Sequence, residues 1–144
     1  MEKDQLSEMN IATPGSGKFI LLGEDDIDDQ EILEEVFSTI DPLLRLHFIN
    51  NGKKLVSHFE GVSDEQLPNL IILDYNMPEL NGAEILRNLN SNIRVKHVPK
   101  IIWSTSNAPA YRDICMQLGA SDYLVKPSKV TVLVDMARYM LSFC

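Results

Sequence analysis

The chain has 144 residues, 44% of them hydrophobic and 24% charged, which fits one domain with a buried core and excludes a disordered chain. Its 13 basic and 21 acidic residues give a net charge of −8, which opposes direct binding to nucleic acid. The polar N-terminus and the lack of an apolar run of membrane-spanning length predict a soluble, cytoplasmic protein with no membrane contact.

The first segment of the chain, residues 1–17, is polar, shows no periodicity and ends in Pro14-Gly15-Ser16-Gly17. Proline, glycine and serine in succession are typical of loops and chain ends rather than of helices or strands. We therefore predict a flexible N-terminal arm over 1–17 and one folded domain over 18–144.

From residue 18 onward, apolar runs alternate with segments of helical spacing. The strand-like runs cover 19–23, 44–49, 70–73, 100–103 and 123–125, and the helical spacing covers 32–40, 55–59, 85–89, 111–118 and 130–141. This alternation predicts an α/β fold, a doubly wound parallel sheet of five strands with helices on both faces. Right-handed crossovers favour the flavodoxin-like strand order 2-1-3-4-5, with the alternating run 44–49 as an edge strand.

Polar side chains stand where four of these runs end. Glu24 and Asp25 follow the first run, Asp74 the third, Ser104 the fourth and Lys126 the fifth. Because the carboxyl ends of parallel strands meet at one edge of a sheet, we expect these side chains to lie close together. Carboxylates, a hydroxyl and an ammonium group at one edge suit a divalent cation and a phosphoryl group.

The acidic residues after the first run have two interpretations. Asp28 and Asp29 fit acids at a helix N-terminus, and we expect their side chains to face solvent. Glu24 and Asp25 at the end of a buried strand repel each other unless a cation lies between them. Asp74 is either a turn cap, a further metal ligand or a nucleophile that forms an aspartyl phosphate.

The cysteines and histidines predict no metal centre or disulfide. Cys115 and Cys144 form neither a disulfide framework nor a Cys-x-x-Cys pair, so we expect free thiols. His47, His58 and His97 lie far apart in the sequence without metal-ligand spacing, and we expect structural or surface roles for them.

Four segments together resemble the receiver domain of two-component response regulators, from about residue 18 to the C-terminus. They are Glu24-Asp25-Asp26, Asp74-Tyr75-Asn76-Met77-Pro78, Ser104-Thr105 and Tyr123-Leu124-Val125-Lys126-Pro127. The chain most resembles stand-alone, single-domain regulators. The resemblance implies that Asp74 accepts a phosphoryl group from a sensor histidine kinase or a histidine phosphotransfer protein.

The same resemblance implies a Mg²⁺ or Mn²⁺ cofactor. Asp25, Asp74 and the backbone carbonyl of Asn76 would bind the cation directly, and Glu24 would act through water. Lys126 would contact the phosphoryl group. Water would later hydrolyse the acyl phosphate, so the chain would be a self-dephosphorylating phosphoacceptor rather than a conventional enzyme.

The switch implied by the resemblance consists of Ser104, which turns toward the phosphoryl group, and Tyr123, which rotates inward behind it. This would bias the surface of the fourth helix, fifth strand and fifth helix for partner binding or phosphorelay, in a monomer or a phosphorylation-dependent dimer. Thr105 and Pro127 support the site, and a cis bond between Lys126 and Pro127 would aim the lysine inward. For Trp103 we expect a half-buried packing role.

Three other functions are weighed against this one. An FMN-binding flavodoxin needs a phosphate-cradling loop after its first strand, whereas residues 24–29 are anionic. A haloacid-dehalogenase-type phosphatase places a second aspartate two residues after its nucleophile, where this chain has Asn76. A pseudo-receiver that binds partners without phosphorylation stays open as the main alternative.

Overall fold

The structure, a computed structural model, describes residues 17–144, and the arm predicted over 1–17 lies outside them except for Gly17. Five parallel strands form one sheet in the order β2-β1-β3-β4-β5. The strands are β1 (Phe19–Gly23), β2 (Arg45–Ile49), β3 (Leu70–Leu73), β4 (Lys100–Ser104) and β5 (Asp122–Val125). The predicted doubly wound fold, the strand order and the edge position of the second strand are confirmed.

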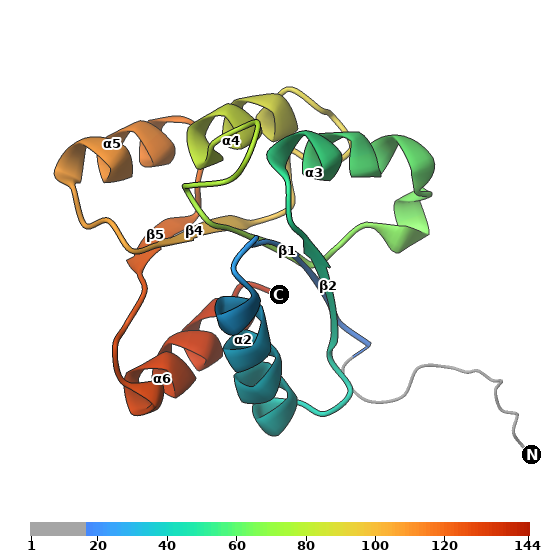
Figure 1. Cartoon of the computed structure of the whole chain (residues 1–144). Coiled ribbons are helices and arrows are strands. Elements are labelled where there is room, and N and C mark those ends of the chain that lie inside the picture. The colour runs from blue at the N-terminus through green and yellow to red at the C-terminus, as the bar shows by residue number, and fades with distance from the viewer. Residues whose placement is uncertain (1–16) are drawn as a thin grey trace, which may run out of the picture.

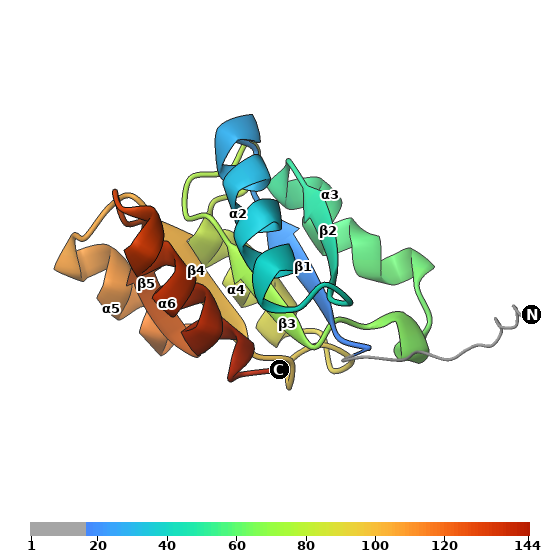
Figure 2. The same cartoon turned by 90° about the horizontal axis from the view of Figure 1, so that it is seen from below.

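Helices cover both faces of this sheet. They are α2 (Ile27–Ile40), α3 (Gly52–His58), α4 (Gly82–Asn90), α5 (Pro109–Gln117) and α6 (Val130–Leu141), with short 3₁₀ turns η2 (Phe59–Gly61) and η3 (Asp64–Gln66). Figure 1 shows α3, α4 and α5 on one face and α2 and α6 on the other. Figure 2, seen from below, shows α2 and α6 side by side in front of the strands. Among residues 17–144, no helix combines the length and the apolar character needed to cross a bilayer.

Two hydrophobic cores lie on the two faces of the sheet, and β3 contributes to both. All four residues of β3 are buried. Its alternating side chains place Ile71 and Leu73 in the core under α3, α4 and α5, and Leu70 and Ile72 in the core under α2 and α6. Burial on both faces explains why this strand is a continuous apolar run and why it lies in the middle of the sheet.

Side-chain caps fix where the helices begin beside the carboxyl ends of the strands. The Asp26 carboxylate accepts a hydrogen bond from the backbone N–H of Asp29, so α2 begins at Ile27, five residues before the helical spacing predicted from the apolar residues. Asn81 and Glu84 form a reciprocal capping box at the start of α4. The capped N-termini of these helices therefore lie beside the strand ends at this edge of the sheet.

Lys100 is a buried cation at the amino end of β4, only 1% exposed. Its ammonium donates hydrogen bonds to the carbonyl oxygens of Val95 at 2.8 Å, Lys96 at 3.2 Å and Val98 at 2.7 Å. Burial lowers the pKa of Lys100 to about 8. The ammonium thus ties the connection before β4 to the strand, although burial disfavours its charged form.

We expect the stabilising contribution of Lys100 to grow with pH. Its folded-state pKa lies below its ordinary value of 10.5, so between about pH 8 and 10.5 the unfolded chain binds more protons than the folded one. The unfolding free energy of wild type minus that of Lys100→Met should therefore rise from about pH 7.5 to about pH 10 in urea titrations. Exposed Lys96→Met is the matched control and should give a constant difference. A constant difference for Lys100→Met would contradict the expectation.

Candidate functional site

Lys126 lies just beyond β5, and its ammonium contacts three carboxylates. Nζ lies 3.0 Å from Glu24 Oε1, 2.9 Å from Asp74 Oδ2 and 2.7 Å from Asp29 Oδ2. The backbone N–H of Lys126 donates to the carbonyl of Ser104 at 2.8 Å, which continues the pairing with β4 and fixes the start of the side chain. An ammonium has three N–H donors, so these three bonds use them all.

The charges around Lys126 shift two pKa values. Burial alone would lower the pKa of Lys126, but hydrogen bonds to Asp29 and Asp74, together with the charges of Glu24 and Asp74, hold it above its usual range. Burial raises the pKa of Glu24 to about 7, while the Asp26 N–H and the Lys126 charge oppose that rise. The ammonium therefore stays charged, and a further cation would favour the ionised form of Glu24.

Glu24, Asp25 and Asp74 could hold a metal ion together. One carboxylate oxygen from each lies within 4.8 Å of the other two. Glu24 and Asp74 are buried and Asp25 is exposed, so the group opens to solvent on one side. Carboxylate oxygens with room for water match the ligand preferences of Mg²⁺ and Mn²⁺. The donor set therefore fits the divalent cation expected from the sequence.

The loop after Asp74 is held by hydrogen bonds and by the start of α3. The backbone N–H of Asn76, an exposed residue, donates to Asp74 Oδ1 at 3.1 Å. Further along the loop, the N–H of Gly52 donates to the carbonyl of Pro78 at 3.0 Å. A Cβ atom on Gly52 would overlap the carbonyl oxygen of Leu80, so only glycine permits this close approach. Both oxygens of the Asp74 carboxylate are thus fixed before any ligand arrives.

Ser104 and Tyr123 lie on the α5 side of the site. Ser104 is fully buried, and its Oγ accepts a hydrogen bond from the N–H of Ser106 at 3.2 Å. Tyr123 is 2% exposed, and its hydroxyl donates to the carbonyl of Ser106 at 2.7 Å. Thr105, which lies between Ser104 and Ser106 in the chain, is exposed. The tyrosine is therefore already inward, and the same loop residue contacts both members of the predicted switch.

Asp29 corrects a prediction made from the sequence. We expected its side chain to face solvent, but it is 30% exposed and forms the shortest of the three ion pairs with Lys126. Asp29 lies four residues before Leu33, which is fully buried, so both residues point from the same face of α2 toward the sheet. That spacing was a signal for the inward position. Asp28, one residue earlier, is exposed as predicted.

Two predictions about the neighbours of Lys126 were also wrong. Trp103 is 2% exposed rather than half-buried, and Lys126 Nζ lies 4.8 Å from the centroid of its ring. Its indole N–H is the one buried side-chain polar group without a hydrogen-bond partner among residues 17–144. The bond between Lys126 and Pro127 is trans, as are all peptide bonds in the described chain. A trans bond is the intrinsically favoured form, and with it the ammonium already reaches Asp74.

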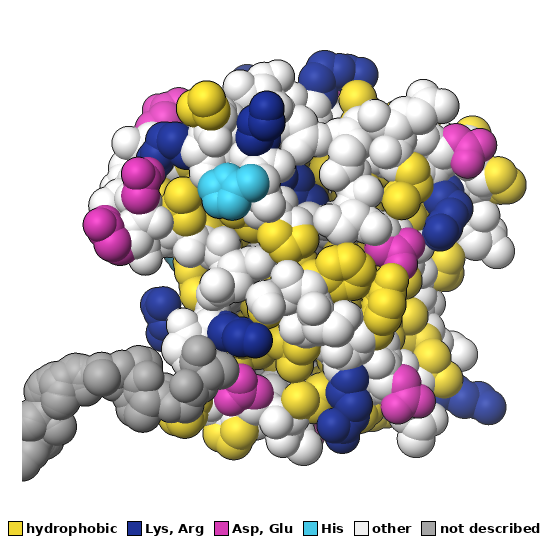
Figure 3. All heavy atoms as spheres, turned by 180° about the vertical axis from the view of Figure 1, so that it is seen from behind, with side chains coloured by type: hydrophobic (Ala, Val, Ile, Leu, Met, Phe, Trp, Pro, Cys, Tyr) yellow, Lys and Arg dark blue, Asp and Glu magenta, His cyan; other side chains and the backbone are white. Residues whose placement is uncertain are grey.

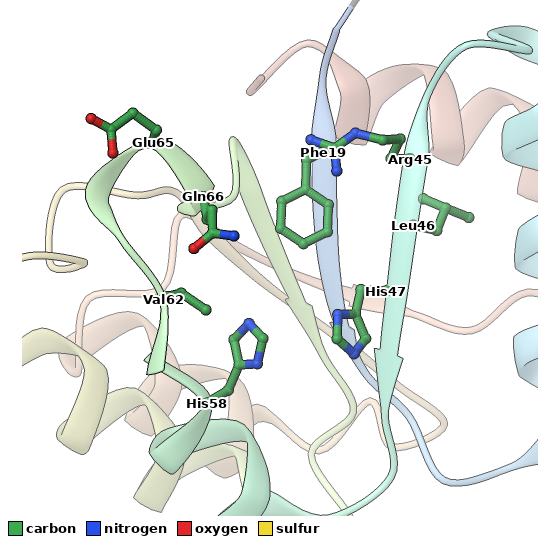
Figure 4. A pocket seen from close by; sticks show the side chains of 8 residues that line it. All are labelled: Phe19, Arg45, Leu46, His47, His58, Val62, Glu65 and Gln66. Atoms are coloured by element: carbon green, nitrogen blue, oxygen red, sulfur yellow. The ribbon is translucent and has the colours of Figure 1, made fainter. Parts of the chain in front are cut away.

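Another pocket in the described residues lies away from the strand-end acids. It has a volume of about 520 Å³ and is lined by Phe19, His47, His58 and residues near them. In Figure 4 the imidazoles of His47 and His58 lie next to each other at this pocket, in an edge-to-face arrangement with centroids 5.2 Å apart. Histidines distant in the sequence are thus neighbours in the fold, although no third metal ligand joins them within the described part of the chain. None of the strand-end residues lines this pocket.

Acidic side chains are scattered on one face of the molecule and clustered at the strand ends. Figure 3, drawn from the side opposite to Figure 1, shows single acidic side chains separated by basic, polar and hydrophobic ones. By contrast, the Lys126 ammonium contacts Glu24, Asp29 and Asp74. Asp25 has a carboxylate oxygen within 4.8 Å of oxygens of Glu24 and Asp74. These four acids thus form a cluster at the carboxyl edge of the sheet.

A sheet of this order with Glu24, Asp25, Asp74, Ser104 and Lys126 at one edge has the arrangement expected of a receiver domain. The chain belongs to the response regulator receiver domain family, which matches residues 20–138. Its relatives are two-component response regulators and related signalling proteins.

Three similar proteins show the range of the match. The chain is 29% identical to chemotaxis protein CheV2 of Helicobacter pylori over 139 residues, which cover 96% of this chain but only 44% of that protein. The Mn²⁺-bound form of response regulator Rcp1 is 30% identical, with coverage of 88% and 93% and a TM-score of 0.74. The receiver domain of a sensor histidine kinase from Pseudomonas aeruginosa PAO1, with a coordinated magnesium ion, is 25% identical, with coverage of 88% and 99% and a TM-score of 0.71.

Proposed function

We propose that this chain is a phosphorylation-controlled response regulator that acts in the cytoplasm and accepts a phosphoryl group on Asp74. The observation that carries the proposal is the position of the Lys126 ammonium, 2.9 Å from Asp74 and 3.0 Å from Glu24 at the edge where Asp25 also lies. A carboxylate nucleophile beside a fixed cation and a cation-binding group of acids suits phosphoryl transfer.

Asp25, Asp74 and the backbone carbonyl of Asn76 would bind Mg²⁺ or Mn²⁺ directly, and Glu24 would act through water. The donor set in the structure and the metal-bound relatives both support this assignment. When bound, the cation would neutralise negative charge on the phosphoryl oxygens.

The residues of the chain supply the remaining chemistry. An oxygen of the Asp74 carboxylate attacks phosphorus, and the bond from phosphorus to the donor breaks. With a phosphohistidine donor, the imidazole nitrogen keeps the electron pair of that bond. Lys126 holds a phosphoryl oxygen, and the Asn76 N–H orients the carboxylate through its hydrogen bond of 3.1 Å. Water later cleaves the acyl phosphate to inorganic phosphate and restores Asp74.

The signal would leave the site through Ser104 and Tyr123. Both contact Ser106 at the start of the loop that leads into α5. A phosphoryl group that draws the Ser104 hydroxyl away from the Ser106 N–H would disturb this loop and the surface of α5, β5 and α6. The partners are a sensor histidine kinase or phosphotransfer protein as donor and a downstream protein, or a second phosphotransfer protein, at that surface.

Acetyl phosphate provides the direct test. With Mg²⁺ and acetyl phosphate, the wild-type chain should gain one phosphoryl group, detected as a mass increase of the intact protein. Chelation of the metal with EDTA before addition of acetyl phosphate should prevent the gain, since the carboxylates would then repel the incoming anion. No incorporation with Mg²⁺ present would favour the phosphorylation-independent pseudo-receiver instead.

A further inference from the structure

Lys126 has an anionic partner outside the group that would hold metal and phosphate. Glu24 and Asp74 approach its ammonium from the ends of β1 and β3, whereas Asp29 approaches from the first turn of α2. The contact to Asp29 is the shortest of the three, at 2.7 Å. The Lys126 side chain is 10% exposed, so solvent screens these contacts less than it screens a surface pair.

There is room for the Lys126 ammonium on the side of the site next to α2. A pocket of about 190 Å³ is lined by Asp29, Trp103, Lys126 and Leu133, among others. The face of the Trp103 ring also lies 4.8 Å from Nζ, and an aromatic face attracts a cation. The ammonium therefore lies between two favourable surroundings, the acids at the strand ends and the carboxylate and indole next to α2.

A phosphoryl group on Asp74 would change the balance between these surroundings. It adds negative charge whose oxygens need the Lys126 ammonium as a hydrogen-bond donor. Asp29 offers the same ammonium a carboxylate, and its own charge repels the phosphoryl oxygens. Both effects have the same sign, because each favours the unphosphorylated site.

We infer that Asp29 is a positioning residue that holds Lys126 in competition with the phosphoryl group on Asp74 and so weakens the phosphorylated state. This inference rests on the proposed function. It assigns to α2 a part in setting how firmly the site retains its phosphoryl group, in addition to the residues at the strand ends.

Asp29→Asn tests the inference, because it removes the charge and keeps the size of the side chain. The probe is beryllofluoride with Mg²⁺, titrated into the folded variants by calorimetry. Asp29→Asn should bind it more tightly than wild type, by roughly fivefold, the effect of losing one partly exposed ion pair. Asp28→Asn is the matched control. It removes the same charge one residue earlier, from an exposed side chain that is not among the ion-pair partners of Lys126 in the described part of the chain. Asp29→Glu restores the charge and should return the affinity toward the wild-type value.

The fluorescence of Trp103 gives a second readout. Trp103 is the only tryptophan in the chain, and the ammonium lies over its ring. Loss of the Asp29 anchor should alter the emission of the free protein in Asp29→Asn and leave it unaltered in Asp28→Asn. Equal affinities and spectra for the two variants would overturn the inference, and so would weaker binding by Asp29→Asn. In either case, binding by the wild type would still support the proposed function. Failure of the wild type to bind beryllofluoride would overturn both.

Discussion

Asp74→Ala is expected to reduce phosphate incorporation from acetyl phosphate and Mg²⁺ to the background level. Asp74 is the acid at the end of the central strand β3, 8% exposed, and both of its carboxylate oxygens have partners in the site. No other carboxylate has the Asn76 N–H and the Lys126 ammonium on its two oxygens, within the described residues. The measurement is the mass of the intact protein after incubation.

The control for this loss is Asp28→Ala, which removes an exposed acid of the same acidic segment and should incorporate phosphate like wild type. Asp74→Asn, nearly the same size as the native residue, should also fail to incorporate phosphate while it keeps a cooperative urea transition. Incorporation by either Asp74 variant would place the phosphoacceptor on another residue and contradict the assignment.

Lys126→Met is expected to lower both phosphorylation and stability. Methionine keeps the length of the side chain but leaves Glu24 and Asp74, both buried, without their counter-charge. Removal of one partner of a buried ion pair is strongly destabilising, so the unfolding free energy in EDTA should fall by about 3 kcal/mol. Loss of one preorganised donor to the phosphoryl oxygens should slow phosphate incorporation by roughly a hundredfold.

Two comparisons separate these effects of Lys126→Met. Exposed Lys129→Met, three residues away, should change neither stability nor phosphorylation appreciably. Mg²⁺ should restore part of the stability of Lys126→Met in urea titrations, because a cation among the carboxylates replaces the missing positive charge. A Lys126→Met variant as stable as wild type in EDTA would show that the three ion pairs contribute little to the fold.

The fold could be predicted from the sequence because each strand is marked by an apolar run with polar residues after it. The run 70–73 is apolar throughout, as a strand buried on both faces must be, and 44–49 alternates as an edge strand does. The start of α2 was harder to place. Its first turn is polar, and the cap by Asp26, rather than an apolar face, defines it.

The convergence of Glu24, Asp25, Asp74 and Lys126 followed from the rule that parallel strands end at one edge. The sequence alone could not show that the Lys126 ammonium shares its three N–H donors among three carboxylates, because this depends on where the fold places α2 against the sheet. Asp29 was assigned to solvent, although its spacing of four residues from buried Leu33 indicated an inward position. Trp103 was misjudged for a related reason, since the helices α2 and α6 that bury it come from distant parts of the chain.

The contact between Lys126 and Glu24 joins residues 102 positions apart. While the chain is being synthesised, the ends of β1 and β3 can therefore be in place as a set of acids that still lacks its ammonium. The Lys126 ammonium becomes available to these acids only after β5 has been synthesised. A product that stops before β5 would keep these acids but lack the ammonium that pairs with them.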